Sequence, residues 1–359
     1  MAVNRSDTEV SQGEQSADFG RRLLEIYTGA ALSSMTVIGY QTGLFEAAAA
    51  GPATSAELAE RAHLEERYVR EWLGAMASGG IMTYDPPTER YELPREHALF
   101  LTGHTIHNAA PQSQLFPLAA SILPDLIACF RQGGGVPYSR FRPAFTQVMD
   151  DTWRRIYDDQ LIGGFLPAAQ GLPERLRAGI GAVDFGCGTG HALNLMAREY
   201  PASRFVGYDL AEDAVAAARQ EATAMGLSNV RFEVQDIAAL PSDSRFDLIL
   251  AFDAIHDQAR PEIVLRAIAR ALAPDGIFFM VEHRFSSDLA KNLENPYAPL
   301  YYSLSTLHCL TVSLAEGGAG LGAMWGEETA RRMLAEAGFM QVEVVDSPRP
   351  QNAIFICRK

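Results

Sequence analysis

The sequence lacks any long apolar segment. None of the apolar runs among its 359 residues approaches the roughly 18 residues that a membrane-spanning helix needs. The first residues, MAVNRSDTEVSQGEQSADFG, contain no apolar core of the kind found in a signal peptide. We therefore expect a cytoplasmic protein without membrane association, in which residues 1–17 form a disordered tail.

Cysteine is also scarce, and its spacing is not that of a metal site. The four cysteines are Cys129, Cys187, Cys309 and Cys357, all far apart along the chain. They are typical of free thiols in a reducing compartment. His104 and His107 are three residues apart, but no carboxylate or third histidine stands at a useful spacing from them. The sequence therefore predicts no metal site.

Basic residues are outnumbered by acidic ones. The chain has 30 lysines and arginines against 44 aspartates and glutamates, which gives a formal net charge of −14. Such a charge disfavours association with nucleic acid or anionic lipid, because both are polyanions. We expect neither as a partner.

The first ordered region, residues 18–95, has the pattern of a winged helix. The stretch TSAELAERAHLEERYVREWLGAMASGG contains a capping box, Thr54 with Glu57, and two short amphipathic helices. IMTYDPPTERYEL follows as two strand-like pieces around a turn. Over residues 53–82 five glutamates stand against three arginines, whereas a helix that crosses phosphates should be basic. We therefore expect this domain to mediate dimerisation, with a homodimer as the result.

The rest of the chain divides into a helical region and an α/β region. Residues 96–175 are predicted to be a helical linker that helps to cover the substrate. From residue 176 to 359, short apolar runs such as GAVDFG, RFVGYD and FDLILAFD alternate with helical stretches. That rhythm predicts a mostly parallel, Rossmann-like sheet with helices on both faces. Residues 284–324 are too long for a loop and are predicted to form a helical insert.

The stretch VDFGCGTGHA places three glycines at alternate positions directly after a strand. Gly186, Gly188 and Gly190 do not form a dinucleotide fingerprint, because His191 occupies the position of its third glycine. No Gly-Lys-Ser/Thr ends the turn, which excludes a P-loop. An adenosine joined to a sulfonium amino acid instead needs close backbone approach, with carboxylates for its ammonium and ribose hydroxyls.

Carboxylates stand where such a ligand would need them. Asp184 precedes the glycines, and Asp209, Asp236 and Asp253 end three later strands, whose carboxyl ends share one edge of a parallel sheet. Asp209 could accept from the ribose hydroxyls, Asp236 from the adenine amino group, and Asp253 lies next to the expected methionine part. Each of these carboxylates could instead be a helix cap or a turn residue.

The ordered motifs VDFGCGTG, GYDL, VQDI and FDLILAFDAIHD resemble those of class I S-adenosylmethionine-dependent methyltransferases over about a hundred residues. The resemblance implies a seven-stranded sheet, with S-adenosyl-L-methionine as donor and S-adenosyl-L-homocysteine as product. It also implies that Asp184, Gly186 and Gly188 lie against the methionine moiety. In the same way, Asp209 with Leu210 would hold the ribose, and Asp236 with Ile237 would flank the adenine. The whole chain resembles a bacterial subgroup labelled as methyltransferases or transcriptional regulators.

Two histidines are candidates for a general base. His256 follows the fourth strand in AIHDQARPE, where similar small-molecule O-methyltransferases have a catalytic histidine, although Gln258 replaces their usual tryptophan. His283 follows the fifth strand. A histidine suits the removal of a hydroxyl proton because its pKa lies near working pH. Capping or packing is the alternative role for His256.

Five further residues are candidate substrate contacts, and each could equally be a core residue: Tyr27, Tyr301, Tyr302, His308 and Trp325. The sequence as a whole predicts an enzyme that methylates a small-molecule acceptor, with oxygen favoured over nitrogen or carbon as the acceptor atom. The alternative is a winged-helix DNA-binding regulator that senses S-adenosylmethionine.

Overall fold

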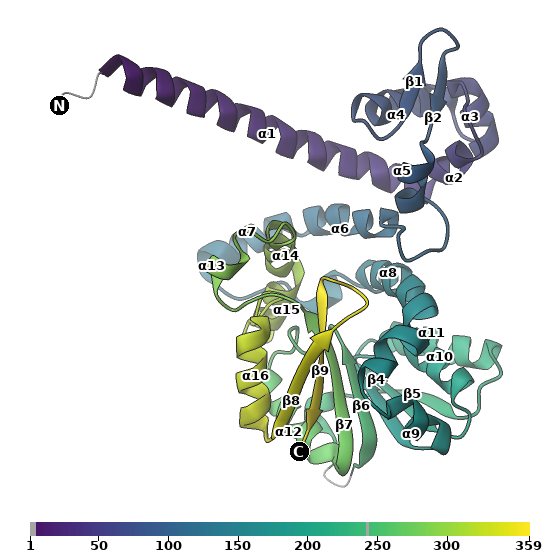
Figure 1. The fold of residues 1–359 in the computed structure, drawn as a ribbon, viewed down its shortest axis with the longest axis vertical. Coiled ribbons are helices and arrows are strands. Elements are labelled where there is room, and N and C mark those ends of the chain that lie inside the picture. Colours follow the sequence, from purple (N-terminus) through teal and green to yellow (C-terminus); the bar gives the residue numbers. More distant parts are fainter. Residues whose placement is uncertain (1–4, 242–243) are drawn as a thin grey trace. The chain divides into compact units, whose positions relative to one another are not determined.

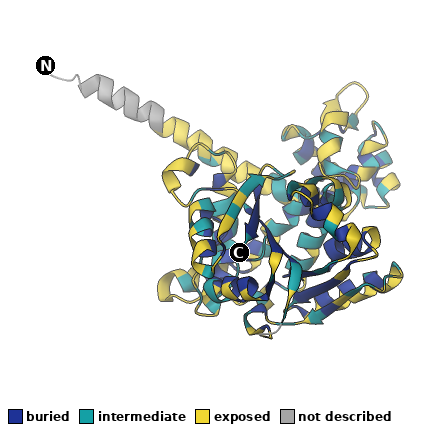
Figure 2. Ribbon diagram, turned by 60° about the horizontal axis from the view of Figure 1, so that its bottom comes forward, coloured by how far each residue is buried: buried dark blue, intermediate teal, exposed yellow. Residues whose placement is uncertain are grey.

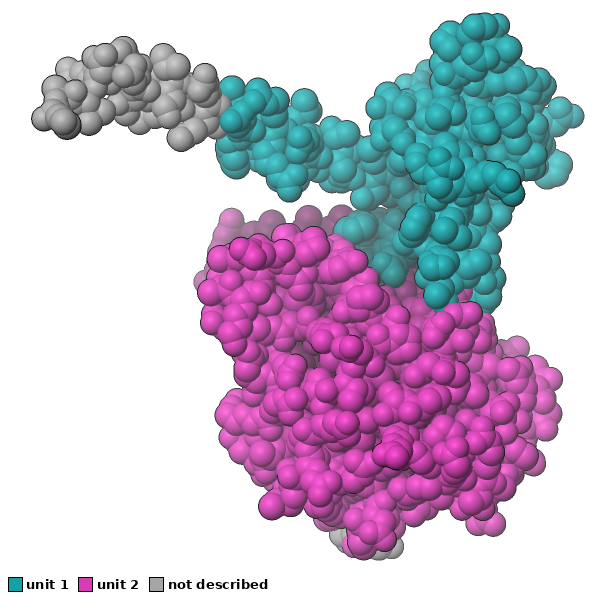
Figure 3. Space-filling model, viewed as in Figure 1, with its two compact units in different colours: residues 1–117 teal, residues 118–359 magenta. Residues whose placement is uncertain are grey.

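The computed structural model describes residues 5–241 and 244–359 and divides the chain into two compact units, residues 1–117 and residues 118–359 (Figure 3). The first unit is helical with one small hairpin (Figure 1). Its elements are α1 (Arg5–Gln41), α2 (Leu44–Ala49), α3 (Ser55–Ala62), α4 (Glu66–Ser78), β1 (Thr83–Asp85), β2 (Arg90–Glu92), α5 (Arg95–Leu101) and the 3₁₀ helix η1 (Ala110–Gln114).

The winged-helix pattern of this unit is confirmed. The Thr54 side chain accepts from the backbone N–H of Glu57, and the Glu57 carboxylate accepts from that of Thr54, which completes the predicted capping box of α3. β1 and β2 pair antiparallel as the wing. The amphipathic faces of α3 and α4 meet α2 in one core, in which Leu58, Trp72 and Leu73 are buried.

The amino-terminal segment differs from the expectation. Residues 1–4 of the predicted tail lie outside the described residues, whereas α1 begins at Arg5 and continues to Gln41. The sequence permits one uninterrupted helix here because no proline stands between these positions.

The second unit contains the α/β fold. Its elements are α6 (Leu115–Ser121, which begins in the first unit), α7 (Leu123–Gln132), η2 (Tyr138–Arg140), α8 (Ala144–Gln160), η3 (Leu161–Phe165), η4 (Leu166–Ala168), α9 (Leu172–Ala178), β3 (Gly181–Phe185), α10 (His191–Glu199), β4 (Arg204–Asp209), α11 (Glu212–Ala224), β5 (Val230–Val234), η5 (Ile237–Ala239), β6 (Phe246–Phe252), α12 (Pro261–Ala271), β7 (Leu272–His283), α13 (Leu289–Asn292), α14 (Ala298–Leu304), η6 (Ser305–Cys309), α15 (Leu310–Ala315), α16 (Gly326–Ala337), β8 (Gln341–Asp346) and β9 (Asn352–Arg358).

These strands form one seven-stranded sheet in the order β5-β4-β3-β6-β7-β9-β8. The strands from β5 to β7 run parallel, and β9 pairs antiparallel with both β7 and β8. The chain order reverses between β3 and β6, so their carboxyl ends form the crevice in which sheets of this kind bind ligands. The predicted α/β fold is confirmed, and β8 and β9 close the sheet as an antiparallel pair.

Helices cover both faces of the sheet, and its inner strands β4, β3, β6, β7 and β9 are mostly buried (Figure 2). Alternate side chains of each strand face opposite sides. Leu248 and Leu250 of β6 pack on the side of α8, α9, α10 and α11, whereas Ile249 packs with α12 and α16. This burial fixes the register that brings the strand ends, and the loops after them, to one edge.

Two segments pack against each other beside this edge. The predicted helical insert forms α13, α14, η6 and α15. The glycine-rich loop around Gly135 is packed in part: a Cβ at Gly135 would lie 1.9 Å from the Thr311 carbonyl oxygen of α15. The Val136 N–H donates to the Thr311 hydroxyl at 2.8 Å. Glycine is therefore required at position 135 by close backbone approach.

Among the described residues, no single helix is long and apolar enough to cross a membrane. One bent pair, Ala110–Ser121 with Leu123–Gln132, passes that test together by length and composition alone.

Candidate functional site

The glycine loop follows β3, and its three glycines have different physical roles. All three have positive φ angles, of 75°, 53° and 73° for Gly186, Gly188 and Gly190. A Cβ at Gly190 would lie 2.5 Å from the Phe232 ring, and one at Gly186 would lie 2.8 Å from the Ala254 methyl group. A Cβ at Gly188 would meet no described atom within 4 Å. Gly190 is thus needed for packing, whereas Gly188 leaves open space beside the loop.

Asp209, at the end of β4, supports that loop. Its carboxylate accepts from the backbone N–H of Gly188 and from that of Ala211, each at 2.8 Å. Burial raises the pKa of Asp209 above its ordinary value, while these two hydrogen bonds oppose the shift. A carboxylate oxygen can accept more than one hydrogen bond, so both oxygens retain capacity for ribose hydroxyls.

Asp184 lies buried on β3, next to the loop. Its Oδ1 atom has no hydrogen-bond partner. Burial, together with the nearby charge of Asp209, raises the pKa of Asp184 to about 7. A buried carboxyl oxygen without a partner is costly in a protein interior, and a positively charged ligand group would satisfy it.

Asp236, which follows β5, has the helix-capping role that the sequence left open as an alternative. Asp236 accepts from the backbone N–H of Ala238 at 2.8 Å and so caps η5. Its side chain is exposed, which leaves the other oxygen accessible, while Ile237 beside it is buried. Leu210, predicted to help hold the ribose, is 63% exposed at the end of β4.

Asp253 follows β6 in a strained backbone conformation, with a φ angle of 48°. The Asn352 side chain of β9 donates to Asp253 Oδ1 at 2.9 Å. Burial and the charge of Glu282 raise the pKa of Asp253 to about 7. Asp184 and Asp253 thus give this edge two acidic groups whose ionisation a cationic ligand would favour.

His256 is buried at the same edge and is held by a residue that sequence reasoning missed. Its Nδ1 lies 2.6 Å from a carboxylate oxygen of Glu282, at the end of β7, and its Nε2 lies 3.3 Å from Asp257 Oδ1. Burial alone would lower the pKa of His256, but the charges of Glu282 and Asp257 outweigh it and raise the pKa well above its usual range. The sequence signal was present: Glu282 immediately precedes His283.

The pKa of His283 is shifted in the opposite direction from that of His256. The two rings lie 5.0 Å apart between centroids. Burial and the positive charges of His256 and Arg349 lower the pKa of His283 well below its usual value. Its Nδ1 is buried without a hydrogen-bond partner and lies 3.6 Å from Asp253 Oδ1. His283 therefore presents a neutral imidazole with a free lone pair or N–H.

Cys309 of η6 joins the His256 cluster. His256, Asp257 and Cys309 each bring one atom capable of metal ligation to within 4.8 Å of one another. No local sequence pattern predicts this grouping, because Cys309 lies on a segment about fifty residues after His256. The absence of a metal site remains a prediction. His104 and His107 lie after the end of α5, in a bend and a turn.

The predicted substrate contacts fall into two groups. Tyr301 of α14 packs edge-on to His283 at 4.8 Å between ring centroids, and His308 stacks on Phe145 of α8 at 3.6 Å with neither ring nitrogen hydrogen-bonded. Tyr302 accepts from Asn292, and Trp325 is buried in the core beside α12 and α16. Tyr301 and His308 thus adjoin the site, whereas Trp325 packs in the core.

Two further aromatic positions need separate mention. Tyr27 lies on α1 of the first unit and is 65% exposed, so its predicted role remains a prediction. Tyr157 of α8 was not predicted: its ring packs edge-on to Phe252 at the end of β6. Burial, with the nearby charges of Asp184 and Asp253, raises the pKa of Tyr157 well above its usual value. No sequence motif marks this tyrosine.

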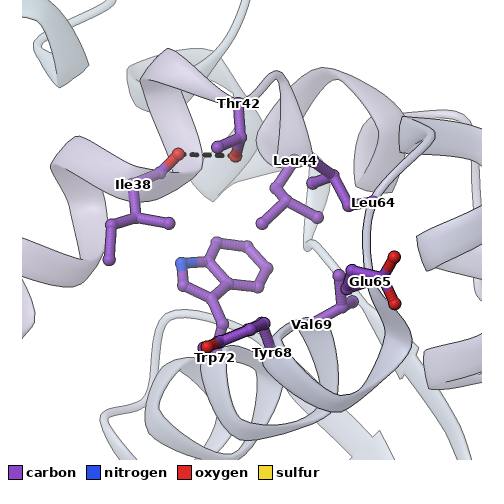
Figure 4. A pocket seen from close by; sticks show the side chains of 8 residues that line it. All are labelled: Ile38, Thr42, Leu44, Leu64, Glu65, Tyr68, Val69 and Trp72. Atoms are coloured by element: carbon purple, nitrogen blue, oxygen red, sulfur yellow. Dashed lines mark hydrogen bonds between the residues drawn. The ribbon is translucent and has the colours of Figure 1, made fainter.

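The first unit has a hollow of its own, of about 260 Å³ (Figure 4). Trp72 lies across it, with its indole N–H donating to the Met35 carbonyl. Its lining is mostly apolar: Ile38, Thr42, Leu44, Leu64, Glu65, Tyr68, Val69 and Trp72. It holds none of the predicted site residues.

Comparisons with known proteins agree with this geometry. Residues 176–338 match a family model described as a methyltransferase domain, and residues 30–103 match an Rv2258c-like winged HTH domain. The trans-aconitate 2-methyltransferase of Variovorax paradoxus is 37% identical over 107 residues, which are 30% of this chain. The chain matches only 38% of the length of that relative.

Solved structures resemble nearly the whole chain. Mitomycin 7-O-methyltransferase MmcR has a TM-score of 0.71 at 18% identity, covering 97% of this chain and 99% of that one. Human N-acetylserotonin methyltransferase, solved with S-adenosylmethionine, has a TM-score of 0.67 at 18% identity, covering 95% and 97%. At these identities the likeness establishes the fold.

The matches place a methyltransferase domain at residues 176–338, after a winged helix-turn-helix domain at residues 30–103. The motif resemblance given above implies S-adenosylmethionine as the donor. The residues present fit that donor: open space lies at Gly188, a buried Asp184 oxygen lacks a partner, and two carboxyl groups ionise more readily beside a cation.

Proposed function

We propose that this protein transfers a methyl group from S-adenosylmethionine to an oxygen of a small-molecule acceptor. The observation that carries the proposal is the buried His256–Glu282 pair, whose Nδ1–Oε2 distance is 2.6 Å. It stands at the end of β6, beside the strand that leads into the glycine loop. A methyl transfer to a hydroxyl needs a proton acceptor at that place.

The donor would be held by residues from four strand ends. Asp209 is suited to the ribose hydroxyls and Asp236 to the adenine amino group, while Asp184 and Asp253 face the charged amino-acid end. When bound, S-adenosylmethionine supplies an electrophilic methyl group on a sulfonium. The open space at Gly188 admits the ligand, and the side-chain-free backbone there allows close approach.

The chain's own part in the reaction is proton transfer and orientation. Glu282 accepts the Nδ1–H of His256 and thereby directs Nε2 away from β7, toward Asp257 and Cys309. Neutral His256 would accept the hydroxyl proton of the acceptor at Nε2, and Glu282 would stabilise the imidazolium that forms. The proton then leaves to solvent when the product departs. His283, with its unpaired Nδ1, is the second candidate and is suited to orienting the acceptor.

A small acceptor is favoured over nucleic acid. The relatives and neighbours reported above are named for trans-aconitate, mitomycin and N-acetylserotonin, three unrelated small molecules. In the winged helix, Arg67 and Arg70 of α4 pair with Glu71 and Glu66. These arginines therefore do not present an unopposed positive face to phosphates.

The rival function, a DNA-binding regulator that senses S-adenosylmethionine, keeps the same donor site and differs only in what the winged helix contacts. A homodimer is part of the proposal, and the apolar side chains exposed on α1, which include Phe19, Leu24 and Ile26, are consistent with a helical partner. Sedimentation of the full chain tests it: a monomer at micromolar concentration would contradict the dimer.

The enzymatic proposal is tested by an acceptor screen with radiolabelled S-adenosylmethionine, in which wild type is compared with His256→Ala. Transfer to a hydroxyl compound by wild type but not by the variant is expected. A variant that transfers as fast as wild type would remove His256 from the mechanism.

A further inference from the structure

Arg349 lies in the turn between β8 and β9, and that turn is tied to the edge of the candidate site. The Arg349 N–H donates to the Ser347 hydroxyl at 3.1 Å, and its carbonyl accepts from the Asn352 N–H at 3.0 Å. Asn352 is paired with His283 across β9 and β7, and its side chain donates to Asp253. The backbone of Arg349 is therefore fixed beside two residues of the site.

The guanidinium of Arg349 is held by an aromatic face rather than by a carboxylate. Its Cζ lies 4.8 Å from the centroid of the Trp153 ring, and Trp153 of α8 is itself buried. Within residues 16–241 and 244–359, Arg349 forms no ion pair, whereas Arg142, Arg154 and Arg284 each pair with a carboxylate. Stacking on an indole leaves the N–H edge of a guanidinium available for a planar anion.

The charge of Arg349 acts on side chains from four elements. Burial is the largest cause of the shifted pKa values of four residues, and the positive charge of Arg349 contributes a lowering effect to each: Tyr157, Asp253, His283 and Tyr301. It opposes the raised pKa values of the two tyrosines and Asp253 and adds to the lowered pKa of His283. These residues come from α8, the end of β6, the end of β7 and α14. The guanidinium thus lies within electrostatic reach of the place where these elements converge.

We propose that Arg349 binds a carboxylate carried by a ligand of the methyl-transfer site. The inference rests on the proposed function. Asp184, Asp209, Asp253 and Glu282 make this edge acidic and would repel an anion, so a carboxylate needs a dedicated cation to bind there. A guanidinium forms two parallel, charge-assisted hydrogen bonds with a carboxylate. The carboxylate belongs either to the methionine part of the donor or to the acceptor.

Calorimetry with four proteins distinguishes these two sources: wild type, Arg349→Gln, Arg349→Lys and the control Arg284→Gln. Arg284 adjoins the same hairpin, but its guanidinium is already paired with Asp346. Each protein is titrated with S-adenosylhomocysteine and with 5′-methylthioadenosine, which lacks the amino-acid end. If the donor carboxylate is the ligand, Arg349→Gln weakens S-adenosylhomocysteine binding about tenfold or more and leaves 5′-methylthioadenosine binding unchanged.

If the acceptor carboxylate is the ligand, Arg349→Gln binds S-adenosylhomocysteine as wild type does. Octanoate, benzoate and citrate are then titrated into each protein saturated with S-adenosylhomocysteine, with octanamide and benzamide as uncharged controls. At least one carboxylate should bind wild type about tenfold more tightly than Arg349→Gln, with Arg349→Lys in between and the amides showing no difference. Arg349→Lys, which retains the charge, also separates charge from the loss of stacking on Trp153.

Two results would overturn the inference alone. One is a wild type that binds S-adenosylhomocysteine while Arg349→Gln matches it in every titration. The other is a loss in Arg284→Gln equal to that in Arg349→Gln, which would indicate a general effect of hairpin charge. A wild type that does not bind S-adenosylhomocysteine would instead contradict the proposed function, and this inference with it.

Discussion

The Nδ1 atom of His256 lies 2.6 Å from Glu282 Oε2, and the other oxygen of the same carboxylate accepts from the backbone N–H of Ile255 at 3.0 Å. One glutamate at the end of β7 therefore fixes both the imidazole and the chain that carries it after β6. Both residues are almost completely buried. A buried, doubly anchored carboxylate of this kind holds the imidazole in one orientation rather than merely neutralising it.

Replacement of His256 should remove turnover without removing donor binding. We expect His256→Ala to lower kcat by about 10²–10⁴-fold, the usual contribution of a general base. The affinity for S-adenosylhomocysteine should change little. His107→Ala, which alters an exposed histidine of the first unit, serves as the control. Unchanged turnover in His256→Ala with a productive acceptor would contradict its role.

The rate should rise with pH. Glu282 and Asp257 overcome the effect of burial and hold the pKa of His256 well above its usual range, and Cys309, His283 and His308 are the other titratable groups that face it. A base must be neutral, so kcat should increase on the alkaline side of neutrality up to that raised pKa. The ion pair of protonated His256 with Glu282 stabilises the fold at low pH, and this contribution is lost as pH rises through the raised pKa of His256.

The dependence of kcat on pH, measured for wild type and for His283→Ala, checks this prediction. The rise of kcat with pH should persist in His283→Ala. A wild-type kcat that does not change above neutrality, or a rise that is lost in His283→Ala, would make His283 the base.

Two glycine substitutions should separate packing from ligand binding. Gly190→Ala would press a Cβ against Phe232 and Ala218, and we expect a destabilisation of about 1–3 kcal/mol. Gly188→Ala meets open space and costs only the left-handed backbone strain of about 1–2 kcal/mol, but it should abolish binding of S-adenosylhomocysteine. Thermal unfolding and calorimetry of both variants provide the measurement. Normal ligand binding by Gly188→Ala would move the donor elsewhere.

Asp209→Ala should weaken donor binding by a few kcal/mol if two charge-assisted hydrogen bonds to the ribose are lost. It also frees the N–H groups of Gly188 and Ala211, so Asp209→Asn, which keeps one acceptor oxygen, is measured beside it. Asp213→Ala changes a nearby half-exposed carboxylate and is the matched control. An equal loss in Asp213→Ala would indicate a long-range charge effect.

Donor affinity should increase between about pH 6 and pH 8. Burial raises the pKa of Asp184 and of Asp253 to about 7, and a cationic ligand favours their ionised forms. The free energy of unfolding of the ligand-free protein should change with pH in the opposite direction. Each carboxyl binds its proton more tightly in the folded state, so its contribution to stability is present below about pH 4 and is lost as pH rises toward 7. Asp184→Asn should flatten the affinity profile measured by calorimetry, and a profile unchanged by that substitution would contradict the role of Asp184.

The sequence predicted those features that short-range patterns determine. Alternating apolar runs and helical stretches predicted the sheet, and the Thr54–Glu57 spacing predicted a capping box that is confirmed. Asp184, Asp209 and Asp253 come to one edge because parallel strands end there together. Asp236 caps η5, which was the alternative that the sequence left open.

The remaining features depend on contacts between distant segments, which no local pattern records. Glu282 meets His256 because β7 lies beside β6, and Tyr157 reaches the site because α8 packs over the sheet. Trp325 belongs to the core because it packs with α12 and α16, two helices that are distant from each other in the sequence. The partner of Arg349, an indole on α8, could not be inferred from a turn between two strands.

The most direct test of the donor site is a calorimetric titration of the full chain with S-adenosylhomocysteine. A gel-shift assay on the DNA upstream of its own coding sequence, with and without this ligand, accompanies it. We predict micromolar binding and no shifted DNA, with or without the ligand. Absence of binding would contradict the donor site, and a ligand-dependent shift would show that the winged helix reads DNA and that the site serves as a sensor.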